Sequence, residues 1–378
     1  MTKYRKPIND LGILEEVRME KTYASGETKM DNNLKIRLLE KLNQIEPKRL
    51  KEFNVVLMPD FFVDHFLTIN DLEEGFSRIR EIYNQGGGNV PGITQSIHQG
   101  GNAANTALAL AKLGINSHLI CRTDALGLNF LQFFLGGKGV NLDGVKTDGN
   151  IAITTAMEFG REHINVLVGD TGSVSDFTFG RLNENDLQTI SNSDITGVVD
   201  WSLNEAGTEL ARDVFKFAKK HNVKTFFDTG DPSHRKREIP KLTKEVLTNK
   251  NLDILGLNEN ELTHYSNITT ANNREDSIKA VLSLKKKIPA RIDLHTASFS
   301  CTINDKCTVT PTIKLSRIFR ATGAGDTWNA GNLFAELLEF NDDERLLFAN
   351  LAAGCYISSS DPIHPSIEKI IDFITQGK

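Results

Sequence analysis

The chain has 378 residues, 39% of them hydrophobic, and carries a net charge of −5 at pH 7. This length allows one large domain or two smaller ones with a proper core. The acidic balance argues against nucleic acid as the main partner, and the lack of any apolar run of about 18 residues argues against a membrane span.

The first residues and the cysteines indicate a reducing compartment. The chain starts M-T-K-Y-R-K-P-I, without the apolar core of a signal peptide. Cys121, Cys301, Cys307 and Cys355 show no C-x-x-C spacing and do not cluster with histidines. This pattern favours buried or free thiols over a zinc site or a disulfide framework. We therefore expect a soluble cytoplasmic protein that binds neither membrane nor nucleic acid.

Residues 1–52 form a charged segment with helical patterning, for which we expect a place on a domain surface or in an oligomer contact. Residues 54–58 are predicted to be a buried strand, and residues 59–64 follow it. Ligands of an α/β sheet gather beyond the carboxyl ends of its strands. Residues 59–64 are therefore a candidate binding segment. For its last residue, Asp64, a simple turn carboxylate is the alternative.

The segment of residues 65–98 has a different pattern. An amphipathic helix is predicted over residues 71–83, and three glycines follow at 86–88. A run of three glycines is typical of a plain flexible loop, and mobile backbone with a function of its own is the other interpretation.

From Ser117 onwards, short apolar strands alternate with helical patterns, which is typical of parallel βαβ units. Residues 151–159 and 163–168 instead form a predicted hairpin joined at Gly160 and Arg161. The fold class that follows is α/β, with a mostly parallel sheet flanked by helices. The other strands are predicted over residues 118–121, 198–201, 225–228, 253–257, 291–295 and 301–303.

Two glycine-rich turns open onto predicted helices. Residues 99–114 read Q-G-G-N-A-A-N-T-A-L-A-L-A-K-L-G, and residues 320–331 read R-A-T-G-A-G-D-T-W-N-A-G. The N–H groups and the dipole of a helix start favour a bound anion such as phosphate. Asp326 would repel that anion unless it takes a proton from a hydroxyl while the N–H groups stabilise a transferring phosphoryl group. The alternative is an ordinary capped helix.

Together the two turns resemble the signature motifs of the ribokinase-like (PfkB) family of carbohydrate and nucleoside kinases. One motif is G-G-x-x-x-N before an Ala-rich helix, and the other is T-G-A-G-D near the C-terminus. The resemblance implies a doubly wound, ribokinase-like sheet with a small β lid. It also implies that Asp326 is the catalytic base and that the backbone of Gly323, Ala324 and Gly325 forms an anion hole.

The resemblance divides the chain into a helical extension, residues 1–52, and a kinase domain, residues 53–378. Residues 65–100 and 151–168 would build the lid, and its apolar face is a candidate homodimer surface. The acceptor would be a sugar, a polyol or a nucleoside. It would be oriented by Asp64, Gly100, Gly101 and Asn105.

The donor side follows from the same resemblance, with ATP as the co-substrate. Asn258 and Glu261 match the family's N-x-x-E motif, which organises Mg²⁺ and its waters near the nucleotide phosphates. The alternative is a helix start rich in carboxylates. Thr322 and Asn350 are assigned to nucleotide binding, and a monovalent cation is a further candidate cofactor.

Two positions depart from the family's pattern. Residues 295–300 read H-T-A-S-F-S, where many relatives have a T-x-G-x-x-G turn beside the nucleotide, and Phe62 replaces a small polar residue of many sugar kinases. His295 is interpreted as structural. The departures leave a second hypothesis, a non-catalytic regulator that binds sugar or nucleotide on the same fold. A dinucleotide-dependent dehydrogenase is excluded, because no G-x-G-x-x-G follows the first strand.

Overall fold

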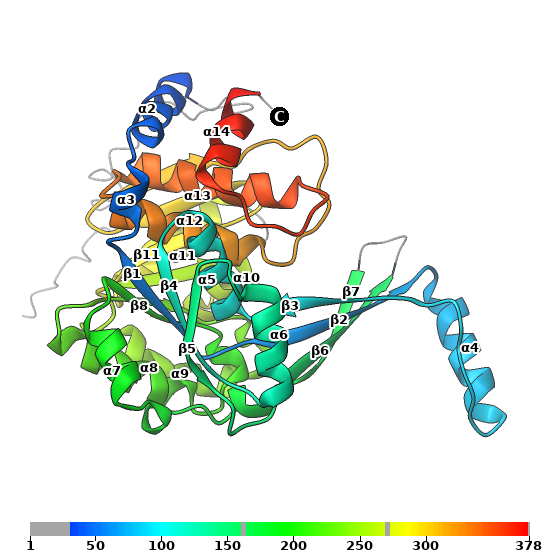
Figure 1. Cartoon of the computed structure of the whole chain (residues 1–378). Coiled ribbons are helices and arrows are strands. Elements are labelled where there is room, and N and C mark those ends of the chain that lie inside the picture. Colours follow the sequence, from blue (N-terminus) through cyan, green and yellow to red (C-terminus); the bar gives the residue numbers. More distant parts are fainter. Residues whose placement is uncertain (1–30, 160–163, 269–272, 377–378) are drawn as a thin grey trace, which may run out of the picture.

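The main sheet is the centre of the molecule (Figure 1). The computed structural model describes residues 31–159, 164–268 and 273–376. Within these residues, nine strands form this sheet. Their spatial order is β13 (Cys307–Pro311), β12 (Phe299–Ile303), β11 (Arg291–His295), β10 (Ile254–Asn258), β9 (Lys224–Asp228), β8 (Ile195–Val198), β1 (Asn54–Met58), β4 (Asn116–Arg122) and β5 (Val140–Lys146).

The strands from β11 to β5 are parallel neighbours, and only β12 and β13 pair antiparallel at one edge. A parallel sheet buried on both faces needs apolar side chains on both sides of each strand. Strand β1 meets this requirement, because Val55 and Leu57 enter one core while Val56 and Met58 enter the other. The predicted α/β class with a mostly parallel sheet is confirmed.

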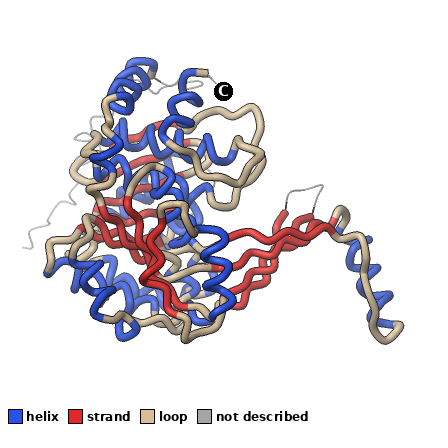
Figure 2. Tube along the Cα trace, in the orientation of Figure 1, coloured by secondary structure: helices blue, strands red, loops and turns tan. Residues whose placement is uncertain are grey.

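Helices cover both faces of this sheet, as Figure 2 shows. No helix within the described ranges is both long and apolar enough to cross a membrane. The first core contains residues of α2 (Asn32–Asn43), α5 (Asn102–Lys112), α6 (Ala125–Leu135), α12 (Ala324–Leu337), α13 (Asp342–Ile357) and α14 (Ile367–Thr375). The second contains residues of α7 (Glu184–Ser191), α8 (Gly207–Lys220), α9 (Ile239–Leu242), α10 (Glu259–Ser266) and α11 (Arg274–Lys285).

A second, smaller sheet extends from the body of the molecule (Figure 1). Its order is β3 (Thr94–Gly100), β2 (Phe62–Ile69), β6 (Ala152–Phe159) and β7 (Ile164–Asp170). Strands β6 and β7 pair antiparallel, which confirms the predicted hairpin. Its predicted joining residues, Gly160 and Arg161, lie outside the described residues.

Helix α4 (Leu72–Asn84) lies at the far end of the second sheet (Figure 1). The side chain of Asp71 caps its first turn by accepting the N–H of Glu74 at 3.0 Å. The helix predicted over residues 71–83 is therefore confirmed. It buries no side chain completely, although Phe76 stacks on Phe159 of β6 with ring centroids 6.3 Å apart.

The described part of the N-terminal segment packs on the first core. Leu34, Leu38 and Leu42 recur every fourth residue on α2 and are buried in this core, as an amphipathic helix requires. On the same helix, Arg37 and Lys41 form ion pairs with acidic residues of α13. The short helix α3 (Pro47–Leu50) then leads into β1.

Candidate functional site

The C-terminal glycine-rich turn forms the start of α12. Gly323 has φ 80°, and a Cβ built on it would lie 2.9 Å from the hydroxyl of Tyr356, so only glycine fits without strain. The N–H of Ala324 donates to the carbonyl of Ala321 at 3.2 Å. The next two N–H groups, of Gly325 and Asp326, begin the helix without intrahelical partners and are available to an anion.

Asp326 joins the two glycine-rich segments. Asn105 of α5 donates its Nδ2–H to Asp326 Oδ2 at 2.9 Å, and Gln99 donates to Asn105 Oδ1 at 3.1 Å. Burial raises the pKa of Asp326 well above its usual value, the Asn105 hydrogen bond opposes this effect, and the charges of Asp228, Asp60 and Asp64 add to it. The carboxylate in the first turn of α12 is therefore held by a neutral donor.

The N-terminal glycine-rich turn is organised by Asp60, which the sequence analysis did not select. Asp60 accepts the N–H groups of Asn102 (2.6 Å) and Ala103 (2.9 Å), the first two residues of α5. Gly101 precedes them with φ 94°, and a Cβ on it would lie 2.9 Å from the Asp60 carboxylate. Burial raises the pKa of Asp60 to about 6 against the effect of these hydrogen bonds. The sequence did contain a signal that could have selected Asp60, since it is an acidic residue two positions after a predicted buried strand.

Asp64 lies on β2 of the second sheet and not in a turn after β1, because the chain enters that sheet at Phe62. Its carboxylate occupies the space in front of Gly100 on β3, where an added Cβ would come within 2.3 Å of Asp64 Oδ1. Burial raises the pKa of Asp64 to about 6, and a hydrogen bond from Thr154 lowers it in part. Gly100 thus allows Asp64 to lie across the neighbouring strand.

Asn258 and Glu261 form a capping box at the start of α10. Glu261 accepts the N–H of Asn258 at 2.9 Å and its Nδ2–H at 2.8 Å, and Glu261 N–H donates back to Asn258 Oδ1 at 3.0 Å. Burial first, and then the charge of Asp228, raises the pKa of Glu261 well above its usual value. Among the described residues, no three His, Cys, Asp or Glu side chains are grouped as a metal site. A cation here would have to rely on water and phosphate oxygens for most of its ligands.

Two further carboxylates lie at the carboxyl ends of neighbouring strands. Asp228 ends β9 and accepts hydrogen bonds from Asn329 Nδ2 (2.6 Å) and from the N–H of Gly230 (3.1 Å). Asp200 follows β8 with φ 52°, and burial, with the charge of Asp60 next, raises its pKa. The sequence analysis treated both residues only as parts of strands. Their position at strand ends could have selected them.

Two of the residues assigned to the nucleotide, Thr322 and Asn350, lie before α12 and against it. Thr322 is exposed directly before Gly323. Asn350 is buried, accepts the indole N–H of Trp328 at 2.8 Å and donates to the carbonyl of Pro311 at 3.1 Å. His295 stacks on the same indole with ring centroids 4.9 Å apart. The nucleotide-binding roles of Thr322 and Asn350 remain predictions.

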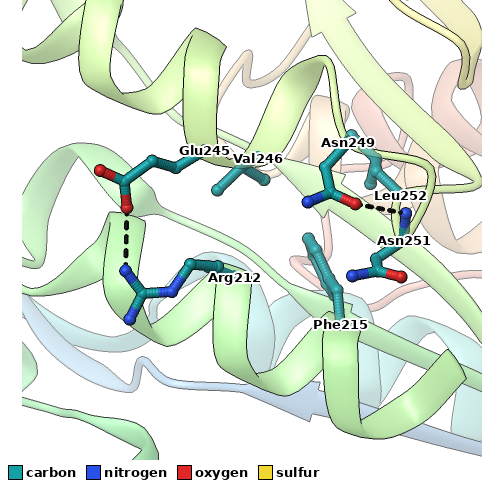
Figure 3. A pocket seen from close by; sticks show the side chains of 7 residues that line it. All are labelled: Arg212, Phe215, Glu245, Val246, Asn249, Asn251 and Leu252. Atoms are coloured by element: carbon teal, nitrogen blue, oxygen red, sulfur yellow. Dashed lines mark hydrogen bonds and ion pairs between the residues drawn. The ribbon is translucent and has the colours of Figure 1, made fainter. Parts of the chain in front are cut away.

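A recess between α8 and the residues that precede β10 lies away from this site. Figure 3 shows its lining, with Arg212 paired to Glu245 at 2.9 Å. Residues 249–252 come before β10, so the recess lies at the amino end of that strand, whereas Asn258 lies at its carboxyl end. We assign no function to this recess, because the candidate site residues of the main sheet, such as Asp228 and Asn258, lie at the carboxyl ends of its strands.

Comparisons with known proteins agree with this geometry. A family model, the pfkB family carbohydrate kinase, matches residues 69–370. A bifunctional ribokinase/ribose-5-phosphate isomerase A of Fructilactobacillus sanfranciscensis is 25% identical over 305 residues, which are 76% of this chain and 53% of that protein. The chain spans between 34% and 65% of the length of the curated relatives that it matches.

Solved structures show the same fold at low sequence identity. The ribokinase of Arabidopsis thaliana, complexed with ribose and ATP, has a TM-score of 0.68 and 21% identity, over 86% of this chain and 99% of that one. The adenosine kinase of Sinorhizobium meliloti has a TM-score of 0.68 and 18% identity, over 87% and 100% of the two chains. The doubly wound, ribokinase-like fold predicted from the motifs is therefore confirmed.

Proposed function

Because the chain belongs to the pfkB family of carbohydrate kinases, we propose that it transfers the γ-phosphoryl group of ATP to a hydroxyl of a sugar, a polyol or a nucleoside. One observation carries this proposal: the two glycine-rich turns meet at one buried carboxylate, with Asn105 Nδ2 2.9 Å from Asp326 Oδ2. A base beside an anion-binding helix start is the arrangement that phosphoryl transfer needs.

In the proposed mechanism, Asp326 takes the proton of the acceptor hydroxyl. Burial raises its pKa, so its ionised form is a stronger base than that of an exposed aspartate. Asn105 holds the carboxylate and leaves its other oxygen free for the hydroxyl. The backbone of Gly323, Ala324 and Gly325 brings the helix start to the transferring phosphoryl group, where its N–H groups and dipole stabilise negative charge.

The acceptor would be held on the side of the second sheet. Asp64 can accept two hydroxyl groups, as the ionised form of a carboxylate does. Gly100 and Gly101 keep the space beside it open, because side chains there would collide with Asp64 and Asp60. Asn105 completes the set by placing the base relative to the bound hydroxyl. In phosphoryl transfer the protein does little covalent chemistry, so the positioning of the reactants contributes strongly to the rate.

The donor side is proposed to use Mg²⁺, which would neutralise part of the negative charge of the nucleotide phosphates. Asn258 and Glu261 would contact such an ion through its bound water molecules. Glu261 is 2% exposed and bonded to Asn258 through both oxygens, so it would hold a metal-bound water and not the ion itself. Thr322 and Asn350 stay in the proposal as nucleotide-side residues. A monovalent cation and a cytoplasmic location remain predictions.

We also propose that the second sheet acts as a lid. It carries Asp64, and closing it over the acceptor would exclude the water that competes for the phosphoryl group. Slower hydrogen exchange at residues 86–100 and 151–159 on addition of the acceptor is the expected result. Exchange that changes only at residues 320–330 would contradict closure.

The outer face of this sheet is the proposed homodimer surface. Ile97, Ile153 and Val168 are 50%, 38% and 57% exposed. They share the face opposite Asp64 by strand register. A charged residue at Ile153, tested by sedimentation, should give monomers if this face joins two copies.

A coupled assay of ADP release tests the proposed reaction directly. The panel should begin with ribose and adenosine, and continue through hexoses, polyols and other nucleosides. Transfer to at least one acceptor is expected. If the protein binds ATP or a sugar but transfers phosphate to no acceptor and hydrolyses no ATP, the alternative, a binding regulator on the same fold, replaces the kinase.

A further inference from the structure

One guanidinium group near the start of α12 is bound by backbone carbonyls and, within the described ranges, by no carboxylate. Arg320 Nη1 donates to the carbonyls of Ser359 at 3.0 Å and Asp361 at 2.7 Å. Its Nη2 donates to the carbonyl of Ser360 at 2.7 Å. The three carbonyls belong to consecutive residues of the loop after α13, so this loop directs its backbone oxygens at a single positive charge.

The guanidinium is fixed by its surroundings as well. Its central carbon lies 5.4 Å from the ring centroid of Tyr356 on α13. Tyr356 in turn stacks on His364, with ring centroids 4.7 Å apart. The N–H of Phe319, the residue before Arg320, donates to the carbonyl of Ile357 at 2.9 Å. Backbone and side chain thus hold this arginine against the end of α13.

The same tyrosine connects the arginine with the proposed anion hole. The hydroxyl of Tyr356 lies 2.9 Å from the position that a Cβ of Gly323 would occupy, and Gly323 is the N-cap of α12. Burial raises the pKa of Tyr356, the charge of Arg320 lowers it, and the charge of Asp326 raises it. The phenol is therefore close enough to the guanidinium and to the proposed base to respond to both charges.

The carbonyls of residues 359–361 resemble the ligands of a monovalent cation. Proteins bind K⁺ with backbone carbonyl oxygens that converge on one point. Here the N–H groups of Arg320 already occupy these oxygens, and a second cation beside the guanidinium would be repelled. The monovalent cation that the motif resemblance suggested therefore does not fit at this loop.

We propose that Arg320 is a built-in cation. Its guanidinium takes the position of a monovalent ion at residues 359–361 and fixes residues 320–323, which lead into the anion hole, in the geometry that phosphate binding needs. Arg320 is a positioning residue, because it acts through this backbone and not by contact with the phosphates. The effect on phosphate rests on the proposed kinase function, whereas the occupied cation position does not.

A side-chain cation differs from a bound ion in one testable way. A bound K⁺ must be taken up from solution, so its effect depends on its concentration. The guanidinium of an arginine is charged at every pH at which the protein is folded and is attached to the chain. The wild type should therefore show no dependence on K⁺.

Two substitutions and one control test the proposal. Arg320→Ala removes the guanidinium and frees the three carbonyls, and Arg320→Lys keeps one positive charge. The control is Arg317→Ala, because Arg317 is an exposed arginine of the same segment whose guanidinium lies over the ring of Phe319 at 4.2 Å. Thermal unfolding and calorimetric binding of the ATP analogue AMP-PNP with Mg²⁺ are measured over a series of KCl concentrations. Tetramethylammonium chloride keeps the ionic strength constant.

The melting temperatures of the wild type and of Arg317→Ala should not respond to K⁺. Arg320→Ala should melt at a lower temperature without K⁺, and K⁺ should raise this temperature, because an ion that binds only the folded state stabilises it. Arg320→Ala should bind AMP-PNP about tenfold more weakly without K⁺ and within about threefold of the wild type at saturating K⁺. Arg320→Lys should depend less on K⁺, since its ammonium group can reach the same carbonyls.

Three results would overturn the proposal. In the first, K⁺ raises the melting temperature or the AMP-PNP affinity of the wild type. In the second, Arg320→Ala loses stability and affinity that neither K⁺ nor Arg320→Lys restores, so that Arg320 is a structural tie without a cation role. In the third, Arg320→Ala responds to K⁺ no more than Arg317→Ala does.

Failure of the proposed function gives a different result. If the wild type does not bind AMP-PNP, but K⁺ still raises the melting temperature of Arg320→Ala alone, the donor in the proposed function is wrong and the built-in cation is supported. If the wild type binds AMP-PNP and K⁺ has no effect on Arg320→Ala, the built-in cation is wrong and the proposed function is unaffected.

Discussion

Asp293 on β11 and Asp326 on α12 are both buried, at 0% and 9% exposure, but their surroundings carry opposite charge. Asp293 contacts Arg291 at 3.0 Å and Arg345 at 3.2 Å. It also accepts hydrogen bonds from Thr302 (2.5 Å) and Asn332 (2.9 Å). Asp326 accepts one hydrogen bond, from neutral Asn105, and forms no ion pair among the described residues.

The pKa values follow this difference. Burial raises the pKa of Asp293, but Arg291 and Arg345 more than compensate and lower it below the usual value. Burial raises the pKa of Asp326 well above the usual value without such compensation. Equal burial therefore produces a permanently charged group in one place and a group able to take up a proton in the other.

The two sites also have different mechanical roles. Asn332 and Glu336 lie in the later turns of α12 and bind Asp293 and Arg291, so the charged network fixes this helix against β11. The same helix presents Asp326 at its first turn. The comparison teaches that the network holds the helix while the carboxylate of Asp326 has no ion-pair partner among the described residues. Four variants, two of them with a matched control, test this division.

The largest effect is expected for Asp326→Asn. If Asp326 is the base, phosphoryl transfer should fall about 10²–10⁴-fold, while nucleotide and acceptor affinities stay nearly unchanged. Stability should not fall, because the variant removes a buried carboxylate that has no cationic partner. Steady-state kinetics and thermal unfolding of the same sample measure both quantities. Activity above about a tenth of the wild type would contradict the base assignment.

Asp293→Asn should show the opposite pattern. Removing the carboxylate that Arg291 and Arg345 share leaves Arg345 with Asp342 as its main acidic partner, and the free energy of unfolding should fall by about 3–5 kcal/mol. The folded-state pKa of Asp293 is lowered, so this stabilisation is present above the unfolded-state pKa, about 3.9, and is lost as pH falls. Urea unfolding at pH 7 and at pH 3 measures the difference.

The matched control for Asp293→Asn is Arg37→Ala. Arg37 pairs with Asp343 at 3.4 Å, and both side chains are more than 40% exposed. Its second contact, with Glu344 at 3.9 Å, is long, and Glu344 keeps Lys41 as a partner. Loss of such a surface pair should change stability by less than about 1 kcal/mol. If the two variants lose the same stability, the buried network does not hold α12 in the way described.

The elements near these two aspartates show what the sequence could predict. Apolar periodicity located the strands on either side of the site, and glycines that need φ above zero marked both turns, since Gly101 and Gly323 have φ 94° and 80°. These signals are local, so they can be read from a few consecutive residues. The hydrogen bond between Asn105 and Asp326 joins residues 221 positions apart. The motif resemblance assigned both residues to one site but did not predict this bond.

What the sequence could not predict depends on long-range packing. Asp60, Asp200 and Asp228 end three different strands, and their approach to Asp326 follows from strand order, which the periodicity does not specify. Asp64 was expected in the segment that follows β1, whereas it lies on β2 because the backbone pairs with β3 and β6. Burial and the charged neighbours, which together determine the pKa direction of each carboxylate, are likewise properties of the assembled fold.

Glu261→Gln tests a third carboxylate, buried like the other two. If Glu261 holds a metal-bound water, the Mg²⁺ concentration for half-maximal activity should rise about 10–100-fold, the usual effect of losing an outer contact. Glutamine keeps one acceptor for Asn258, so folding should persist. A metal titration of activity is the measurement. An unchanged titration would favour a purely structural capping box.

The smallest and most specific effect is expected for Asn105→Ala. The Asn105 hydrogen bond favours the ionised form of Asp326 and so lowers its pKa. Without this bond, the pKa should rise further, and a base that must be ionised would lose activity at low pH first. The acid limb of the kcat/KM profile should therefore move up by about one pH unit, with a smaller loss at pH 8 than at pH 6.

Gln99→Ala is the matched control for Asn105→Ala, because Gln99 contacts Asn105 Oδ1 and is not bonded to Asp326. It should move the acid limb in the same direction by a smaller amount, since Asn105 is then held less firmly. If Asn105→Ala lowers kcat/KM by the same factor at every pH, Asn105 acts on the acceptor alone. The pKa of Asp326 would then be determined by burial and its neighbouring carboxylates, without a contribution from the first glycine-rich turn.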